Sequence, residues 1–261
     1  MNLLPSRGGI LTAVGVRCFA FVGLLLVGTN VAHAQAISGG DDRYKTPQRF
    51  ALELRFGPYK PNVDSEFSGT DARQPYADFF GSSRRLMSQL EFDYQPIQHI
   101  GSLGIGIGIG YFNETGHDLK ADGSALPSAD TSTLRLIPVS GSIVYRFDLP
   151  WERLHIPLVP YAKVGLDYVI WTVRDGNGEI PTGPSGAKGQ GGTFGWHGVV
   201  GLSLVLNFLD PGAARQFDTE MGVNRTHVFA EFGHYDISGL GAKQKLHVGD
   251  DTWMAGMLFE F

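Results

Sequence analysis

The sequence predicts an all-β chain that closes into an antiparallel up-and-down transmembrane β-barrel of about eight strands. The first observation is a series of segments, each about ten residues long, in which apolar and polar side chains alternate. The second is that the connections between these segments are alternately long and short. The third is that one face of each segment carries large apolar side chains, whereas the other is rich in glycine, serine and charge.

The chain opens with a segment typical of a secretory signal peptide. Arg7 and Arg17 supply positive charge, residues 19–27 form a short apolar core, and residues 32–34 (Ala-His-Ala) are a small-x-small cleavage site. The alternative is a retained single-span anchor, but the apolar core is shorter than the roughly 18 residues that a membrane helix needs. We therefore expect residues 1–34 to be removed during export.

The remaining chain, residues 35–261, is predicted to form a single barrel domain that begins with a short periplasmic segment, 35–48. The leader holds two arginines, no acidic residue and the only cysteine, Cys18, so its removal changes the net charge from −5 to −7. An acidic chain does not favour nucleic acid as a partner, because phosphate binding needs a basic face. No later apolar run is long enough for a membrane helix, which leaves a soluble periplasmic protein or a closed barrel.

Four segments in the first half of this domain alternate with the period of a strand. Their apolar faces carry Phe50, Leu52, Leu54 and Phe56; Leu86, Leu90, Phe92 and Tyr94; Leu103, Ile105, Ile107, Ile109 and Tyr111; and Ile137, Val139, Ile143, Tyr145 and Phe147. Four segments in the second half do the same. Their apolar faces carry Ala162, Val164, Leu166, Tyr168 and Ile170; Phe194, Trp196, Val200, Leu202, Leu204, Leu206 and Phe208; Val228, Ala230 and Phe232; and Trp253, Ala255, Met257, Phe259 and Phe261.

The connections differ systematically in length. Those after the first, third, fifth and seventh segments are long and polar, and cover about residues 57–84, 113–129, 172–192 and 238–249. The others are "PIQHIGS", "DLPWERLHIP" and "LDPGAARQFDTEMGVNR", the last of which is expected to hold one or two helical turns. Long loops at one end and short turns at the other are typical of outer-membrane barrels.

The apolar faces decide between a soluble and a membrane barrel. In a soluble carrier of the lipocalin kind they would line the interior, but an eight-stranded barrel has room for little more than one layer of side chains. Aromatic residues also form two girdles, which are expected at the two membrane interfaces. The girdle at the short-turn end comprises Phe50, Tyr94, Phe147, Phe208 and Phe261, and the one at the long-loop end comprises Phe56, Tyr111, Trp171, Phe194, Trp196 and Trp253.

The third segment contains a run of alternating glycines, "LGIGIGIGY". The glycines expected to face a narrow interior are Gly104, Gly106, Gly108 and Gly110. There they would clear space for long side chains such as Glu91, Asp93 or Lys163. The alternative, a nucleotide-binding loop, fails because no start gives the G-x-G-x-x-G spacing and a loop follows where a helix is required.

Eight charged side chains are predicted to point inward, with acids and bases in comparable numbers. They are Glu53, Arg55, Glu91, Asp93, Arg146, Lys163, Asp167 and Glu260. We expect them to pair and to plug the barrel, because an unpaired buried charge is strongly unfavourable. The alternative is a proton or ion path, or a lining that selects solutes. Two positions are open for Arg135: above the membrane rim, or inward if a bulge near Pro138 shifts the register.

The stretch "EFGHYD" offers Glu231, His234 and Asp236 close to Ser238, residue types that hydrolases use for nucleophilic catalysis. A general base must reach its nucleophile, however, and Glu231 and His234 fall on opposite faces of a strand. A structural role of His234 at the membrane interface is therefore the preferred interpretation. We predict no catalytic set and no enzyme activity.

The third long loop places Asp175, Asn177 and Glu179 at alternate positions near glycines, which is one arrangement of calcium ligands. The twelve-residue pattern of a calcium loop is absent, so a turn is the simpler interpretation. We predict neither a metal nor a cofactor. Four further histidines lack metal-ligand spacing: His117, His197, His227 and His247.

Several stretches together resemble a known family: "FALELRFGPYKPNVDSEF", "LEFDYQ", "GIGIGIGYF", "LRLIPVSGSIVYRFD", "IPLVPYAKVGLDYVIW" and "WMAGMLFEF". The chain resembles the outer-membrane β-barrel family first described in myxobacteria, small barrels whose members have no assigned activity. The resemblance covers essentially the whole chain after the leader, and "IPLVPYAKVGLDY" is its most specific part. It implies nothing about catalysis.

The end of the chain also resembles the C-terminal signal that the barrel-assembly machinery reads. The residues concerned are Trp253, Met257, Phe259 and Phe261. This resemblance implies that the machinery is a partner during biogenesis and that both termini lie in the periplasm.

These observations favour a bacterial outer-membrane barrel with a structural or surface-interaction role, a plugged interior and extracellular loops as the working parts. Outer-membrane lipid and lipopolysaccharide are the expected partners, and the sequence identifies no extracellular one. Two alternatives stay open: a lipid-modifying or proteolytic outer-membrane enzyme, and a narrow conduit for small solutes.

Overall fold

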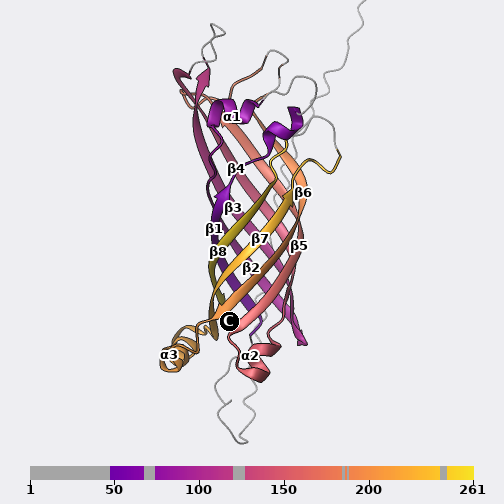
Figure 1. Ribbon diagram of the computed structural model, residues 1–261, viewed down its shortest axis with the longest axis vertical. Coiled ribbons are helices and arrows are strands. Elements are labelled where there is room, and N and C mark those ends of the chain that lie inside the picture. The colour runs from indigo at the N-terminus through magenta and orange to yellow at the C-terminus, as the bar shows by residue number, and fades with distance from the viewer. Residues whose placement is uncertain (1–47, 68–73, 120–126, 184–185, 187, 242–245) are drawn as a thin grey trace, which may run out of the picture. The chain divides into compact units, whose positions relative to one another are not determined.

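The computed structural model describes residues 48–67, 74–119, 127–183, 186, 188–241 and 246–261. They form a closed barrel of eight antiparallel strands, in which each strand pairs with its neighbours along the chain and β1 pairs with β8 (Figure 1). The predicted fold class is confirmed. The predicted leader, residues 1–34, lies outside the described residues, as does nearly all of the segment 35–48.

Two of the strands are much longer than expected. β3 and β4 have 19 and 20 residues, and their ladder continues into the predicted loop 113–129. It runs without a shift to the pair of His117 with Thr131 and, after a shift in register, ends at the pair of Leu119 with Pro127. The outward side chains there, Asn113 and Thr115, are polar and exposed, so the contrast in hydropathy that reveals a strand is missing from the sequence. The strands are β1 (Phe50–Tyr59), β2 (Arg85–His99), β3 (Gly101–Leu119), β4 (Pro127–Arg146), β5 (Leu158–Arg174), β6 (Gln190–Val205), β7 (Arg225–Asp236) and β8 (Asp250–Glu260).

Short helices occupy three of the connections in the described chain. α3 has 11 residues, or about three turns, where one or two are expected from the sequence. Asp210 caps its first turn by accepting hydrogen bonds from the N–H groups of Gly212 and Ala213, and Gly222, with a φ of 72°, ends it. None of these helices is long and apolar enough to cross a membrane. The helices are η1 (Val63–Phe67) and α1 (Pro75–Phe80) after β1, α2 (Leu149–Leu154) after β4, and α3 (Pro211–Met221) after β6.

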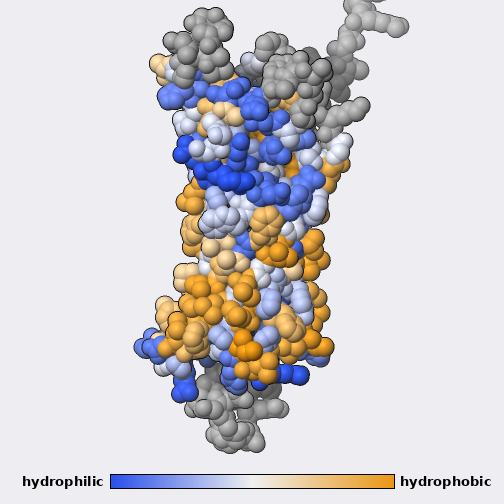
Figure 2. Space-filling view, in the orientation of Figure 1, coloured by the Kyte–Doolittle hydropathy of each residue, from blue (hydrophilic) through white to orange (hydrophobic). Residues whose placement is uncertain are grey.

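Side chains alternate between the two faces of the barrel wall. On β3 the isoleucines point outward, Ile107 being 70% exposed, and the intervening glycines face inward. Figure 2 shows apolar residues gathered over the wall near α2 and α3, and hydrophilic residues over the opposite end near α1. We call this outward-facing band the apolar belt; among its members are Leu54, Phe92, Ile105, Ile107, Ile143, Val164, Leu166, Val200, Leu202 and Met257.

The structure corrects the predicted position of Trp171 and decides the position of Arg135, both near the long-loop end. The sequence assigns Trp171 to an aromatic girdle, but the residue lies on the inward face of β5, an even number of positions from Asp167, and packs against buried apolar side chains. Arg135 lies on the outward face of β4, with its guanidinium carbon 5.9 Å from the ring centre of Tyr111. The β3–β4 register passes Pro138 without a shift, so the bulge that would turn Arg135 inward is not formed.

The interior also contains an apolar layer towards the long-loop end, which the sequence pattern does not indicate. All eight strands contribute to it, and Val63 of η1 and Tyr76 of α1 extend it into the first loop. The layer separates the charged interior of the barrel from the long-loop end. Its members on the strands include Tyr59, Met87, Phe112, Leu136, Val169, Val199, Tyr235 and Met254.

Candidate functional site

The charged side chains that the sequence places inward are all deeply buried. Each of the eight, Glu53, Arg55, Glu91, Asp93, Arg146, Lys163, Asp167 and Glu260, is at most 4% exposed. Burial of so many charges is tolerable only where each has an opposite charge or hydrogen-bond partner. Their contacts therefore determine whether the interior is filled or leaves a path.

Lys163 and two arginines hold the acids together across the barrel. Lys163 Nζ, which enters from β5, donates hydrogen bonds to Glu53 and, at 2.9 Å, to Glu91 Oε1. Arg146 donates to Glu53 and Asp93, and Arg55 donates to Glu91. Because β5 lies across the barrel from β1 and β2, these ion pairs bridge the interior. We call this set of six residues, together with Glu231 and Tyr161, the ionic plug.

Glu231 and Tyr161 complete the ionic plug and are missing from the charges picked out in the sequence. Glu231 accepts hydrogen bonds from Arg55 Nη1 at 2.9 Å and from the Tyr161 hydroxyl at 2.8 Å. The alternation of the seventh segment places Glu231 on the inward face with His227, but the catalytic alternative groups it with His234. Tyr161 precedes the fifth predicted segment by one residue, so the segment's boundary hid it.

The four interior glycines make room for this packing. A Cβ at Gly106 would collide with the Asp93 carboxylate and come within 3.3 Å of Glu91 Oε1. A Cβ at Gly108 would collide with Ser140, and one at Gly110 would meet Pro138. A Cβ at Gly104 would lie 2.8 Å from the carbonyl oxygen of Tyr94. Asp93 and Glu91 are thus the charged side chains next to the run, and Lys163 is not among its nearest neighbours.

Asp167 does not join the ionic plug. Its Oδ2 lies 2.7 Å from His197 Nδ1, and His197 Nε2 lies 3.2 Å from Ser142 Oγ. The order serine, histidine, aspartate is that of a hydrolytic triad, but all three residues are at most 5% exposed. The adjoining void measures about 10 Å³, which is room for about one water molecule. A substrate therefore has no access to Ser142.

Glu260 forms a second chain of the same kind at the short-turn end. Its Oε2 lies 3.5 Å from His227 Nε2, and His227 Nδ1 lies 3.2 Å from Ser203 Oγ. Arg225 Nη1 is 3.8 Å from the same Glu260 oxygen. Both chains join side chains from neighbouring strands, so they depend on strand register, which the sequence pattern does not reveal.

The structure separates the residues of the "EFGHYD" stretch. Glu231 points into the barrel, whereas His234 lies on the outer face, where its Nδ1 is 2.5 Å from Asp251 Oδ1. The calcium-like loop is a turn, in which Asp175 Oδ1 accepts hydrogen bonds from the N–H groups of Asn177 and Glu179.

One group of acids in the described chain has ligand atoms close enough to share a metal ion. Glu53, Glu91 and Asp93 bring one oxygen each within 4.8 Å of one another. All three carboxylates are instead engaged by Lys163 and the two arginines of the ionic plug. The donor set therefore matches an ion-pair network.

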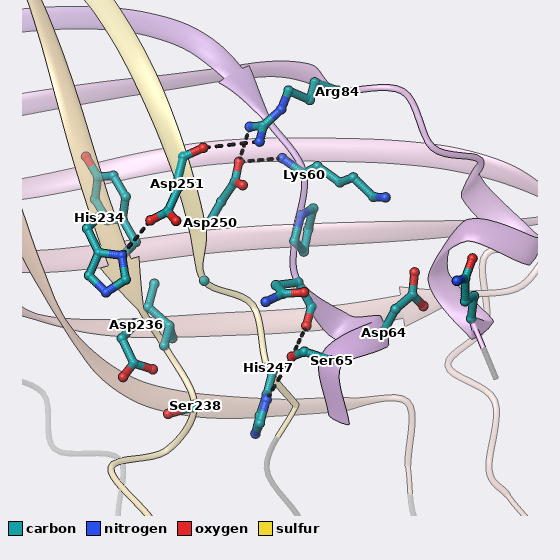
Figure 3. Close-up of a pocket in the computed structure, with 16 residues that line it drawn as sticks. Lys60, Asp64, Ser65, Arg84, His234, Asp236, Ser238, His247, Asp250 and Asp251 are labelled. Carbon is teal, nitrogen blue, oxygen red and sulfur yellow. Dashed lines mark hydrogen bonds and ion pairs between the residues drawn. The ribbon is translucent and has the colours of Figure 1, made fainter. Parts of the chain in front are cut away.

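A larger hollow opens at the long-loop end of the barrel (Figure 3). It measures about 750 Å³ and lies between the first loop and the adjoining ends of β7 and β8. Arg84 pairs with Asp250 at 2.5 Å, and Ser65 Oγ lies 3.2 Å from His247 Nδ1. We call this hollow the outer pocket. Polar side chains dominate its lining, and they include Lys60, Gln74, His234, Asp236, Ser238 and Asp251.

Comparisons with known proteins give similarity in fold alone. No family model matches the chain, and no curated protein matches it in sequence. The chain is similar to the outer membrane protein OprG from Pseudomonas aeruginosa, with 14% identity, a TM-score of 0.46, and coverage of 82% of this chain and 96% of that chain. The myxobacterial kind of barrel remains a prediction.

Two further solved structures are similar at the same level. One is Ail, the attachment invasion locus protein of Yersinia pestis, in complex with the heparin analogue sucrose octasulfate, with 10% identity, a TM-score of 0.38, and coverage of 82% of this chain and 97% of that chain. The other is the N-terminal β-barrel domain of Pseudomonas aeruginosa OprF, with 11% identity, a TM-score of 0.39, and coverage of 82% and 99%.

Proposed function

We propose that the chain is an integral protein of the bacterial outer membrane, with a barrel closed to solutes and a structural or surface-interaction role at its extracellular end. The apolar belt supports membrane insertion, because side chains such as Ile107 are exposed where a soluble barrel would bury them. The hydrophilic wall near α1 would then stand outside the cell (Figure 2). The short-turn end, with α2 and α3, would face the periplasm.

The observation that carries this proposal is the difference in volume between the void beside the ionic plug and the outer pocket at the long-loop end. The void beside the ionic plug measures about 10 Å³, and the apolar layer lies above it. The outer pocket, by contrast, measures about 750 Å³ and opens at the long-loop end. Among the described residues, a ligand or neighbouring molecule therefore finds room in the outer pocket, whereas the void beside the ionic plug holds about one water molecule.

Electrical recording in planar bilayers tests the closed interior. We expect no steady conductance steps from the purified protein under conditions in which an open porin gives them. Incorporation is verified separately by recovering the protein from the membrane. Reproducible steps that depend on the protein would contradict a closed barrel and favour a conduit.

Surface labelling of intact cells tests the orientation. In a chain with Cys18→Ser, Asp251→Cys places a thiol beside the outer pocket, and Thr219→Cys places a matched thiol on α3. A membrane-impermeant maleimide should label the first in intact cells and the second only after the outer membrane is opened. The reverse order would overturn the proposed topology.

The lipid and assembly partners belong to the same proposal. Arg135 holds a guanidinium on the outward face beside Tyr111, which is suitable for the phosphates of lipopolysaccharide. At the other end, Phe261 closes the barrel: its N–H donates to the carbonyl oxygen of Phe50 at 2.8 Å. If the barrel-assembly machinery reads this terminus, deletion of Phe261 should reduce the amount of assembled protein in the outer membrane. Unchanged assembly would remove the machinery's signal from the proposal.

A further inference from the structure

α3 carries an apolar stripe that the barrel does not bury. Ala213, Ala214, Phe217 and Met221 lie within one third of the helix circumference. Phe217 and Met221 are 45% and 67% exposed, and the helix has no buried residue. The helix itself is well defined, with a complete N-cap at Asp210 and a left-handed glycine at its end. An exposed apolar stripe on a capped helix needs a covering surface to be stable in water.

A groove of about 350 Å³ separates this stripe from the barrel wall. Ala213, Ala214 and Phe217 line it on the helix side. Met257 and Phe259, which point outward from β8, line it on the barrel side. The connection into the helix is anchored, because Asn207 accepts a hydrogen bond from Thr226 N–H at 3.0 Å and donates to the Asn224 carbonyl oxygen at 2.8 Å.

The groove is continuous with the apolar belt. Met257, which forms part of its wall, is 42% exposed and belongs to the belt itself. Figure 1 shows α3 projecting sideways from the short-turn end of the barrel, and Figure 2 shows apolar wall directly above it. Whatever covers the belt therefore also reaches the groove, which selects lipid over a soluble partner.

We propose that α3 lies in the periplasmic interface of the outer membrane and that its groove holds an acyl chain of an inner-leaflet phospholipid. This inference rests on the membrane insertion proposed above. Helices with one apolar and one polar face lie flat at such interfaces, with the apolar face among the acyl chains. Thr219, opposite the stripe, faces water on this arrangement.

Spin labels in phospholipid nanodiscs test the position of the helix. In the Cys18→Ser chain, a label at Phe217→Cys should collide several-fold more often with oxygen, which is lipid-soluble, than with a water-soluble nickel chelate. A label at Thr219→Cys, on the opposite side of the same helix, should show the reverse. A label at Ile107→Cys on the apolar belt serves as the reference for membrane insertion.

The labels distinguish failure of the inference about α3 from failure of the proposed membrane insertion. If the label at Ile107→Cys reports lipid and that at Phe217→Cys reports water, α3 stands free in the periplasm and the inference fails while the proposed function survives. If Ile107→Cys reports water, membrane insertion itself fails. If Phe217→Cys is shielded from both reagents, protein covers the stripe, and the lipid assignment is overturned.

Fluorescence quenching tests the occupant of the groove. A fluorophore at Ala214→Cys should lose several-fold more emission in nanodiscs whose phosphatidylethanolamine carries brominated acyl chains than in unbrominated ones. The same fluorophore at Thr219→Cys should not change. Equal emission at Ala214→Cys in both lipids would exclude an acyl chain from the groove even if α3 lies at the interface.

Discussion

Replacement of Lys163 by methionine should strongly destabilise the barrel. The Lys163 side chain is fully buried, donates to Glu53 and Glu91, and lies 4.0 Å from Glu231. In the native plug, four carboxylates share three basic groups; without Lys163, two arginines remain for the same four. Methionine fills a similar volume, so the change removes the charge and the hydrogen bonds with little loss of packing.

The expected loss follows from the burial of the partners. Breaking a buried ion pair from one side costs about 3–5 kcal/mol, because the remaining charge is left without compensation. An exposed pair is worth about 1 kcal/mol or less. The matched control is therefore Asp251→Asn, which breaks a contact with His234 between side chains that are 62% and 52% exposed.

Urea titration of the protein in phospholipid vesicles, followed by tryptophan fluorescence, measures both changes. Lys163→Met should lose about 3–5 kcal/mol of unfolding free energy and Asp251→Asn no more than about 1 kcal/mol. Adding Glu91→Gln to Lys163→Met should recover part of the loss, since three carboxylates in place of four then share the two arginines. A Lys163→Met loss as small as that of the control would refute the ionic plug as a set of paired buried charges.

Three further predictions concern the wall, the belt and the periplasmic turn. Gly106→Val should lower the unfolding free energy by about 1–3 kcal/mol, because the new side chain meets Asp93. Gly141→Ala is the control and should be nearly neutral, since its Cβ meets no atom within 4 Å. Equal losses of unfolding free energy in the same urea titration would contradict the role of Gly106. Ile107→Lys should cost about 2–4 kcal/mol in vesicles, as expected for a cation near the bilayer midplane, and a loss near zero would place the residue in water. Asp148 precedes α2 at the short-turn end, beside Ser102 at the start of β3. Burial raises the pKa of Asp148 even though the Ser102 hydroxyl donates to it, so the folded chain binds this proton more tightly than the unfolded chain does. That stabilisation is present at low pH and is lost as the pH rises from the ordinary pKa of aspartate, about 4, through the raised pKa. Asp148→Asn should therefore lose less stability than the wild type as the pH rises above about 4, and identical slopes would contradict the assignment.

The sequence predicts the fold well because a strand's period of two sorts side chains onto faces independently of tertiary detail. Ile107 outside and Glu53 inside follow from parity alone. The same parity, applied consistently, moves Trp171 from the aromatic girdle to the interior. Strand length is harder to predict, since Asn113 and Thr115 continue the β3 ladder in water with polar side chains on the outer face.

Contacts between side chains of different strands cannot be predicted from a single sequence. The pairing of Asp167 with His197, and of His197 with Ser142, depends on the registers that align β4, β5 and β6. The ion pair of Glu231 with Arg55 depends on closure of the barrel between β8 and β1, which brings β7 close to β1. Face and periodicity are local properties of a strand, whereas register and closure are properties of the whole sheet.

A nuclear Overhauser measurement on methyl-labelled protein in phospholipid nanodiscs tests most directly which side of the barrel wall the isoleucines face. If isoleucines face lipid and the charges are sealed inside, acyl-chain protons should transfer magnetisation strongly to the δ1 methyl of Ile107, and the Lys163 ammonium protons should exchange slowly with water. Transfer to Ile107 only from other side chains, together with rapid exchange at Lys163, would mean that isoleucines fill the interior and charges face water, and would contradict this arrangement.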